Sequence, residues 1–446
     1  MVVFNRSVFA ALVAICAAGS VGQVVLTPQR PDGLYAPGDT AAWTVTPARG
    51  AATTQASYVV LKNGRRPAVK EGMLDLTNGS AAIEYPLGEP GQITIEVTPR
   101  PANTTTAPST ARFPGDRNGM PRRSNTPTRD GAIFGVEQLR PALPRPDDFD
   151  AFWTAKLAEL NAVPANPQLD ALDVNVPGVD YHRVTLDNIR GTHVRGQIAK
   201  PSRDGKFPAV LQLQYAGVYP LQRQWVTDRA KTGWIAMNLL AHDMPIDDAD
   251  AIKRLAESEL KNYQAIGNTD REQSYFLRMY LGDCQALKYL TSRPDWDDKT
   301  LVVVGDSMGG QQSFATVGLV GEALHVTAMI VHVPAGGDVG ARSVGRSIAY
   351  PNWPDQPDTI RTGQYFDIAN FAPRIKVPTL VSLGLFDTTC PPTSVAAAYN
   401  NLAGPKELLP LHSDHGGPGQ RPREVRRKEW LAALVQGKAA SLRVSR

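Results

Sequence analysis

Cysteine is scarce in this chain. Three cysteines occur among 446 residues, at Cys16, Cys284 and Cys390. Two thiols beyond the N-terminal segment are too few for a disulfide framework of the kind that stabilises small secreted domains. One bridge between Cys284 and Cys390 is compatible with an oxidising compartment, and the sequence leaves this pairing open.

A long apolar run and an excess of one charge are also missing. Beyond the N-terminus, no segment has the roughly 20 consecutive apolar residues that a membrane-spanning helix requires. The chain has 47 basic and 43 acidic residues, a formal net charge of +4, and no basic run interleaved with aromatic residues. These features argue against a nucleic-acid partner. The basic stretch 421–428 is interrupted by Glu424, and we interpret it as a solvated helix face.

Residues 1–22 resemble a secretory signal. Arg6 is followed by an apolar run at 8–15 and then by small residues, a pattern typical of a cleavable signal peptide. We therefore predict cleavage near Gly22 and a secreted or periplasmic protein. Cys16 offers the alternative of a lipid anchor, but the bulky residue before it disfavours that interpretation.

Residues 23–115 are predicted to form a small all-β domain. They lack helical periodicity and show short alternating runs at 42–45, 58–61, 82–85 and 92–97. Asn-Gly pairs at 63–64 and 78–79 are typical of tight turns between strands. We predict an immunoglobulin-like β-sandwich, in which these asparagines are structural.

A linker and a larger domain follow the predicted sandwich. The stretch 101–129 is rich in Thr, Pro, Arg and Asn and cannot bury a core, and we place the linker at 116–135. In residues 136–446, strand-like runs alternate with helical stretches. This alternation predicts an α/β domain with a mostly parallel sheet covered by helices on both faces.

A nucleophile motif lies inside this larger domain. The apolar run 301–304 leads directly into Gly305-Asp306-Ser307-Met308-Gly309, and residues 311–316 can begin a helix. A strand, a tight turn with serine and a helix make the nucleophile elbow of an α/β-hydrolase. The glycines two residues before and after Ser307 are needed because a Cβ there would collide with a neighbouring strand or helix. The motif predicts Ser307 as the nucleophile.

An acid and a base follow Ser307 in the chain order that this fold uses. Asp387 comes just after a strand-like run at 377–384, and His415 lies in a Gly-rich loop after a second run at 407–411. Asp387 could instead be a turn residue that closes its strand. His412 competes with His415 as the base, but its place at a strand end favours a partly buried structural role. We predict Ser307, Asp387 and His415 as the catalytic residues.

Acyl transfer also requires backbone donors for the developing oxyanion. The amide of Met308, directly after the nucleophile, is one candidate. The second usually follows an early strand. Residues 207–214 are such a strand, so the amide of Tyr215 is the other candidate, with packing of a loop aromatic as the alternative role for this residue.

From about Asp147 to the C-terminus, the chain resembles the carbohydrate esterase family of acetyl xylan esterases and cephalosporin C deacetylases. The segments that carry the resemblance are 148–153, 214–217, 280–286, 290–296 and 384–392, and the last is the most specific. The resemblance implies the same five site residues, Ser307, Asp387, His415, Tyr215 and Met308. The chain departs from the family pattern at Met308, where Gln is usual, and at Gly416, where Glu is usual. The family's Arg-Gly-Gln motif is missing after the second core strand.

The resemblance implies a secreted serine esterase that removes acetyl groups from carbohydrate, such as xylan or its oligosaccharides, and needs neither a cofactor nor a metal. It also implies a homo-oligomer, although a bulky front domain would obstruct a ring of subunits. Two alternatives remain open. One is an acyl-CoA thioesterase or acyltransferase, which secretion would disfavour. The other is a degenerate hydrolase that only binds carbohydrate. A serine exopeptidase is disfavoured because the front domain is too small for a propeller.

Overall fold

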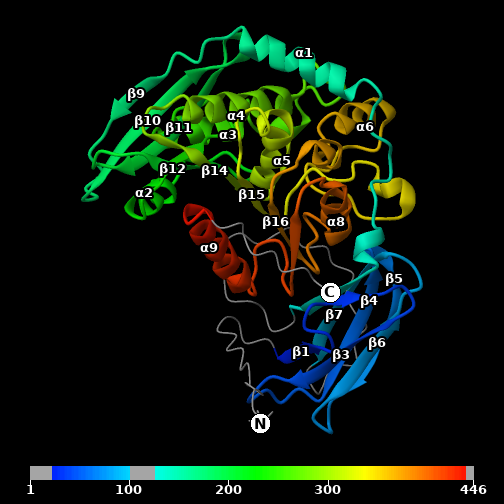
Figure 1. Ribbon diagram of the computed structural model, residues 1–446. Coiled ribbons are helices and arrows are strands. Elements are labelled where there is room, and N and C mark those ends of the chain that lie inside the picture. The colour runs from blue at the N-terminus through cyan, green and yellow to red at the C-terminus, as the bar shows by residue number, and fades with distance from the viewer. Residues whose placement is uncertain (1–22, 101–125, 438–446) are drawn as a thin grey trace, which may run out of the picture.

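The computed structural model describes residues 23–100 and 126–437 (Figure 1). The predicted signal peptide at 1–22 lies outside the described residues, as does the first half of the predicted linker, 116–125. Within the described ranges, no helix is both long and apolar enough to cross a membrane.

Residues 23–100 and 126–134, which we call the N-terminal β unit, form two sheets. The first has the order β1-β3-β6 and is antiparallel, with β1 (Val24–Pro28), β3 (Thr40–Pro47) and β6 (Ala81–Pro86). The second has the order β2-β8-β7-β4-β5, with β2 (Leu34–Tyr35), β8 (Thr128–Phe134), β7 (Gly91–Arg100), β4 (Gln55–Lys62) and β5 (Arg65–Asp75). Apolar side chains from both sheets, Trp43 and Ile95 among them, meet in one core. The immunoglobulin-like topology and the domain boundaries stay predictions.

The predicted linker at 116–135 is too long at its C-terminal end. Residues 128–134 form β8, which pairs with β7 and buries Asp130 to Phe134. This strand follows a segment rich in Thr, Pro and Arg and begins with charged residues, so its sequence gives no alternating apolar signal. Pairing with β7, rather than local propensity, accounts for the strand.

A nine-stranded sheet forms the centre of the C-terminal unit, residues 136–437. Its order is β17-β16-β15-β14-β12-β13-β11-β10-β9, and the six strands from β17 to β13 are parallel. The strands are β9 (Gln168–Ala171), β10 (Val179–Asp187), β11 (His193–Pro201), β12 (Phe207–Leu213), β13 (Ile235–Leu239), β14 (Trp296–Asp306), β15 (Ala328–His332), β16 (Thr379–Gly384) and β17 (Lys406–Leu411). The mostly parallel sheet is therefore confirmed, with antiparallel strands at one edge.

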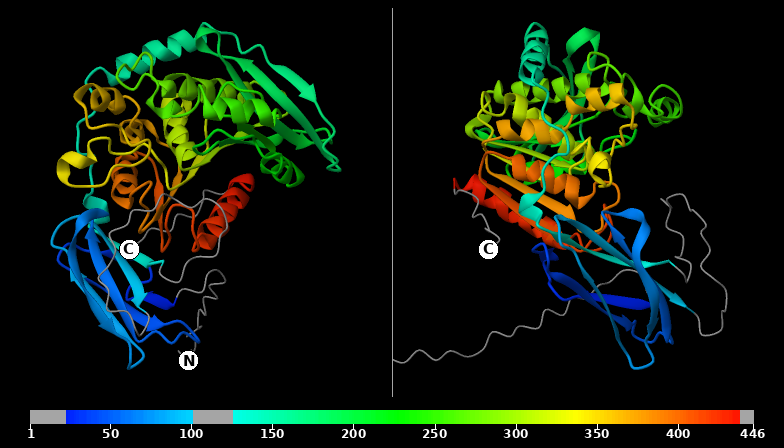
Figure 2. Two further views of the ribbon diagram at one scale, coloured as in Figure 1. Left: turned by 180° about the vertical axis from the view of Figure 1, so that it is seen from behind. Right: turned by 90° about the vertical axis from the view of Figure 1, so that its right-hand side faces the viewer.

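Helices cover both faces of this sheet (Figures 1 and 2). They are α1 (Phe149–Asn161), α2 (Gln224–Lys231), α3 (Ala249–Glu257), α4 (Tyr275–Thr291), α5 (Met308–Val320), α6 (Pro357–Gln364), α7 (Ile368–Phe371), α8 (Pro392–Asn401) and α9 (Arg421–Val435). Short 3₁₀ turns lie at Val136–Gln138, Ile189–Gly191, Tyr263–Ala265, Ala341–Val344 and Ala372–Arg374.

The two faces explain why β14 is apolar at consecutive positions. Leu301 and Val303 belong to the large core with α1, α4, α5 and α8. Val302 and Val304 belong to a second core with α2 and α9. Since successive side chains in a strand point to opposite faces, a strand covered on both sides needs an uninterrupted apolar run. The site lies where β12, β14 and β16 end.

Candidate active site

Ser307 lies in a strained turn between β14 and α5. Its φ of 56° and ψ of −121° are unusual for a residue with a side chain. Two backbone hydrogen bonds of Ser307 hold the turn. Its N–H donates to the carbonyl of His332 at 2.8 Å, and its carbonyl accepts the N–H of Ala335 at 3.0 Å. Ser307 is only 8% exposed.

The glycines of the elbow are required for steric reasons. A Cβ on Gly305 would lie 2.1 Å from the carbonyl oxygen of Gly309, and a Cβ on Gly309 would lie 2.3 Å from that of Leu213. Both obstacles are backbone atoms, which cannot rotate away as a side chain could. The structure confirms the collision with a neighbouring strand or helix that the motif predicts.

The structure brings Ser307, His415 and Asp387 together in one chain of hydrogen bonds. The Oγ of Ser307 is 2.9 Å from Nε2 of His415, and Nδ1 of His415 is 2.8 Å from Oδ2 of Asp387. The carboxylate can only accept, so Nδ1 carries a proton, and an Nε2 without a proton would present a lone pair to the serine hydroxyl. His412 points elsewhere, toward Asp130 of the N-terminal β unit. The arrangement can remove the proton of an attacking hydroxyl.

Asp387 is a buried acid, and both of its carboxylate oxygens have hydrogen-bond partners. Its Oδ1 accepts the N–H groups of Thr389 at 2.7 Å and Cys390 at 2.8 Å, while Oδ2 faces His415. Burial raises the pKa of Asp387 above its ordinary value, and the hydrogen bond and charge of His415 oppose that rise. The carboxylate therefore depends on these donors to stay ionised. Its contact with His415 sets Asp387 apart from a residue that only closes a turn.

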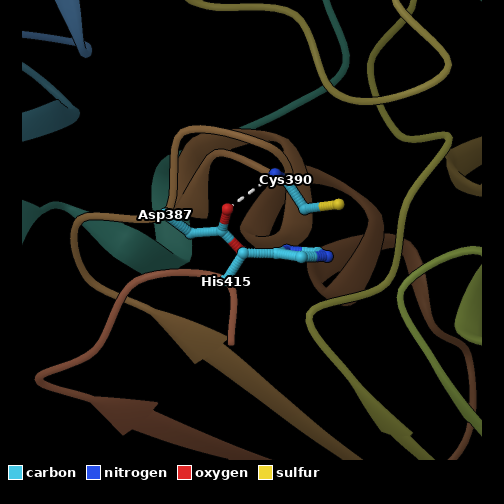
Figure 3. A group of neighbouring side chains, drawn as sticks. All are labelled: Asp387, Cys390 and His415. Atoms are coloured by element: carbon cyan, nitrogen blue, oxygen red, sulfur yellow. Dashed lines mark hydrogen bonds and ion pairs between the residues drawn. The ribbon is translucent and has the colours of Figure 1, made fainter. Parts of the chain in front are cut away.

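Asp387, Cys390 and His415 offer three ligand atoms within 4.8 Å of one another (Figure 3). Figure 3 shows Asp387 and Cys390 on one loop and His415 on another, with Asp387 bonded to the backbone of Cys390. Both carboxylate oxygens already accept N–H groups, and burial raises the pKa of the Cys390 thiol well above its usual range. A protonated thiol and a committed carboxylate are poor metal ligands. We interpret Asp387 and His415 as members of the predicted Ser307–Asp387–His415 triad, and Cys390 as a backbone donor to Asp387.

Cys284 and Cys390 are both buried free thiols. The bridge that the sequence left open is therefore absent from the described part of the chain.

The two predicted oxyanion donors lie at the same edge of the sheet. Leu213 of β12 is paired with Gly305 of β14 in parallel register. Tyr215 and Ser307 each lie two residues further along their segments, so both leave the sheet at adjacent points. Met308 is the first residue of α5, and first-turn amides have no acceptor within their own helix. Amides in these positions can hold a negative oxygen.

The loop of Tyr215 is fixed by residues that the sequence did not single out. Gly217 donates its N–H to the hydroxyl of Tyr263 at 3.2 Å, and its carbonyl lies 3.1 Å from Nε2 of His242. The carbonyl only accepts, so His242 carries its proton on Nε2. Burial lowers the pKa of His242 to about 4, which keeps the ring neutral. His242 had no pairing signal because Gly217 is 25 residues away along the chain.

Asp306, directly before the nucleophile, is held by α9. Its Oδ2 lies 2.7 Å from Nη1 of Arg423, and its Oδ1 accepts from Arg427. Burial would raise the pKa of Asp306, but the charges of Arg427 and Arg423 lower it well below its ordinary value. The two arginines are four residues apart and so share one helix face. The stretch 421–428 is thus more than a solvated face, since two of its cations bind at the elbow.

Comparisons with known proteins show which proteins this chain is similar to. A family model described as acetyl xylan esterase (AXE1) matches residues 132–335 and 349–432, more than half of the chain. The curated acetyl esterase Axe7A of Xylanibacter ruminicola is 32% identical over 286 residues, which cover 62% of this chain and 64% of that protein.

Two solved structures share the fold of the C-terminal unit. An acetyl xylan esterase from a Paenibacillus species has a TM-score of 0.55 at 24% identity, over 68% of this chain and 98% of that one. Acetyl xylan esterase 1 from a Thermoanaerobacterium species has a TM-score of 0.54 at 20% identity, over 68% and 97% of the two chains.

Proposed function

Because the chain belongs to the acetyl xylan esterase family, we propose that it is a serine esterase that removes acetyl groups from carbohydrate. Family membership implies a carboxylic ester hydrolase with an α/β-hydrolase core. One observation supports the serine mechanism above all others. The Oγ of Ser307 lies 2.9 Å from His415, whose other nitrogen lies 2.8 Å from Asp387.

The first half of the proposed reaction forms an acyl-enzyme. His415 takes the hydroxyl proton of Ser307 on Nε2 as Oγ attacks the acetyl carbonyl carbon. The carbonyl oxygen becomes negative and is held by the amides of Tyr215 and Met308. Asp387 stays ionised and stabilises the imidazolium. His415 then protonates the sugar oxygen, which leaves as the alcohol.

The second half releases acetate. Water gives a proton to Nε2 of His415 and attacks the acetyl-Ser307 carbonyl, and the same amides hold the second oxyanion. Collapse of this intermediate returns the proton to Oγ. Ser307, His415 and Asp387 already lie within hydrogen-bonding distance of one another, so closure of a further segment is not needed to assemble the triad.

A carbohydrate substrate is supported by the family and by one feature of the surface. The ring of Tyr215 is 41% exposed and stacks on Tyr219 at 5.0 Å between centroids. An exposed aromatic ring on the loop that follows β12 suits the apolar face of a sugar ring. We also propose export through the signal at residues 1–22, which mass analysis of protein recovered outside the cytoplasm would test.

The activity is tested with Ser307→Ala and with a matched serine variant in α5, the helix that follows Ser307. Ser313 is fully buried and donates to the carbonyl of Gly309 at 2.7 Å, so Ser313→Ala controls for loss of a buried hydroxyl. We expect acetate release from acetylated xylan, and from small acetylated sugars, to fall more than about 1,000-fold in Ser307→Ala. Ser313→Ala should stay within about threefold of the parent. Turnover by Ser307→Ala within tenfold of the parent would refute the assignment.

A fluorophosphonate probe separates an enzyme from a protein that only binds carbohydrate. The parent and Ser313→Ala should form a covalent adduct on Ser307, located by peptide mass analysis. A parent chain that binds acetylated xylan but forms no adduct would support the degenerate alternative.

A further inference from the structure

The N-terminal β unit contacts both loops that carry the triad. We call residues 385–391 the acid loop, because it holds Asp387, and residues 412–420 the base loop, because it holds His415. Figures 1 and 2 show the blue strands of this unit beside the orange and red segments near the C-terminus.

The acid loop rests on β7 and β8. Gln92, which is 1% exposed, donates from Nε2 to the carbonyl of Leu385 at 2.9 Å. Gly131 lies so close to the same carbonyl that a Cβ there would be 2.3 Å from the oxygen. Leu385 is only two residues before Asp387. The backbone that leads to the catalytic acid is therefore fixed by a buried hydrogen bond and a close backbone contact from another unit.

The base loop is anchored at its first residue, His412. Nδ1 of His412 lies 2.6 Å from Oδ1 of Asp130, and Nε2 lies 3.0 Å from the carbonyl of Pro31. A carboxylate and a carbonyl are both acceptors, so two good hydrogen bonds require both ring nitrogens to carry protons. The geometry is that of an imidazolium cation with two donors in use.

Asp130 is itself held in place for this contact. Its Oδ2 accepts from Nε1 of Trp43 at 3.1 Å, and its Oδ1 accepts from the N–H of Gly131 at 2.8 Å. Asp130 is 4% exposed. The acceptor that faces His412 therefore belongs to the core of the N-terminal β unit and cannot easily move away.

The charges around His412 in the described residues favour the cation. Burial lowers the pKa of His412, but the hydrogen bond and charge of Asp130, the carbonyl of Pro31 and the charge of Asp32 together raise it above 6.5. On the base loop itself, Asp414 lies 3.9 Å from Arg129 of β8 and accepts the N–H of His415 at 2.8 Å. The cationic anchor is present below this raised pKa and is lost as pH rises through it.

We propose that the N-terminal β unit is a positioning element of the active site, in which Asp130 and Pro31 bind His412 as a cation and thereby hold the catalytic His415 in line with Ser307. Gln92 does the same for the acid loop. The inference rests on the proposed function, because it gives His415 the role of base. His412 is a positioning residue, since it acts through a loop and touches no reacting atom.

The test uses full-length His412→Gln and Asp130→Asn, with His182→Gln as the control. His182 lies on β10, near the opposite edge of the large sheet from β17. We expect kcat for a small acetate ester to fall about tenfold or more in both test variants, with KM within about threefold, because small displacements of a catalytic group cost mainly rate. His182→Gln should match the parent. The rate of fluorophosphonate labelling should fall with kcat.

The pH profile separates positioning from general loss of structure. In the parent, kcat should decline as pH rises through the raised pKa of His412, and this limb should be missing in His412→Gln. If His412→Gln folds poorly, Asp130→Asn decides, because it removes the charge with little change of shape. Parental kcat and labelling rate in the folded Asp130→Asn variant would overturn the proposal.

Hydrogen–deuterium exchange distinguishes failure of this inference from failure of the proposed function. Amides of the peptide 412–420 should exchange faster in His412→Gln than in the parent, while those of β12 should not change. This readout does not need activity. Unchanged exchange in the base loop of His412→Gln would refute the proposed anchor, even if the parent is an active esterase. Faster exchange in a protein whose parent has no esterase activity would support the anchor and reject only the proposed function.

Discussion

Removal of the Asp306 carboxylate should destabilise the protein far more than removal of an ordinary surface carboxylate. Asp306 lies between Arg423 and Arg427, whose side chains are each 21% exposed. The charge of Asp306 also acts on the half-buried Arg229, where it opposes desolvation and the charge of Arg427, which lower the pKa of Arg229 to about 10. In Asp306→Asn, Arg423 and Arg427 lose the carboxylate that both bind, and Arg229 loses its attraction while the repulsion from Arg427 remains.

The magnitude follows from burial. One ion pair near a protein surface is worth about 4 kcal/mol at 4 Å before desolvation is counted, and breaking a buried pair from one side costs about 3–5 kcal/mol. The Asp306 side chain is 29% exposed, so water screens part of this interaction. We expect Asp306→Asn to lower the free energy of unfolding by about 2–3 kcal/mol.

Urea unfolding followed by tryptophan fluorescence measures this loss. Glu322→Gln is the matched control, because Glu322 pairs with Lys376 at 3.0 Å while 74% exposed, and exposed pairs contribute about 0–1 kcal/mol. The folded pKa of Asp306 is lowered, so its stabilisation is complete above the ordinary value of 3.8 and is lost as pH falls through the folded value. A loss no larger than that of Glu322→Gln at pH 7, or a difference that persists at full size below the folded pKa, would refute the reasoning.

Three further predictions concern the elbow, the acid and the thiols. Gly309→Ala should lower the thermal midpoint strongly or prevent folding, because the new Cβ would lie 2.3 Å from a backbone oxygen of β12, whereas Gly416→Ala has open space and should match the parent. Asp387→Asn should lower kcat about 1,000- to 10,000-fold without unfolding the protein, as measured by ester turnover and circular dichroism, because the amide no longer fixes the tautomer of His415; a loss below tenfold would contradict the triad. Cys284 and Cys390 should resist Ellman's reagent in the native protein and react after unfolding, since both are fully buried and burial raises both thiol pKa values; rapid native labelling of either would contradict this burial.

The sequence was sufficient to predict the parts of the site that depend on local pattern. The run before Ser307 is apolar because β14 is covered on both faces, and the elbow glycines are needed because their Cβ atoms would meet backbone. Chain order after the elbow then points to Asp387 and His415. These signals lie within short windows, where periodicity and sterics act directly.

The partners that connect distant segments could not be predicted in the same way. β5 is mostly exposed and β8 follows a Pro-rich stretch, so neither has a core-facing alternation. The sequence favours a partly buried structural role for His412, and the structure agrees, but the sequence does not identify its partner Asp130, which is 282 residues away. The pairing of Asp306 with Arg423 spans 117 residues. Such contacts depend on how distant segments pack in the folded protein. They cannot be predicted from the composition or the spacing of residues within a short stretch of sequence.

The contact between His412 and the carbonyl of Pro31 joins positions that are 381 residues apart in the sequence. Pro31 is synthesised well before the base loop, so this contact cannot form until residue 412 has also left the ribosome. Long-range closures of this kind are slow steps in folding. The amides of the base loop should therefore gain protection from hydrogen exchange late in refolding, after the N-terminal β unit and the C-terminal unit have packed together.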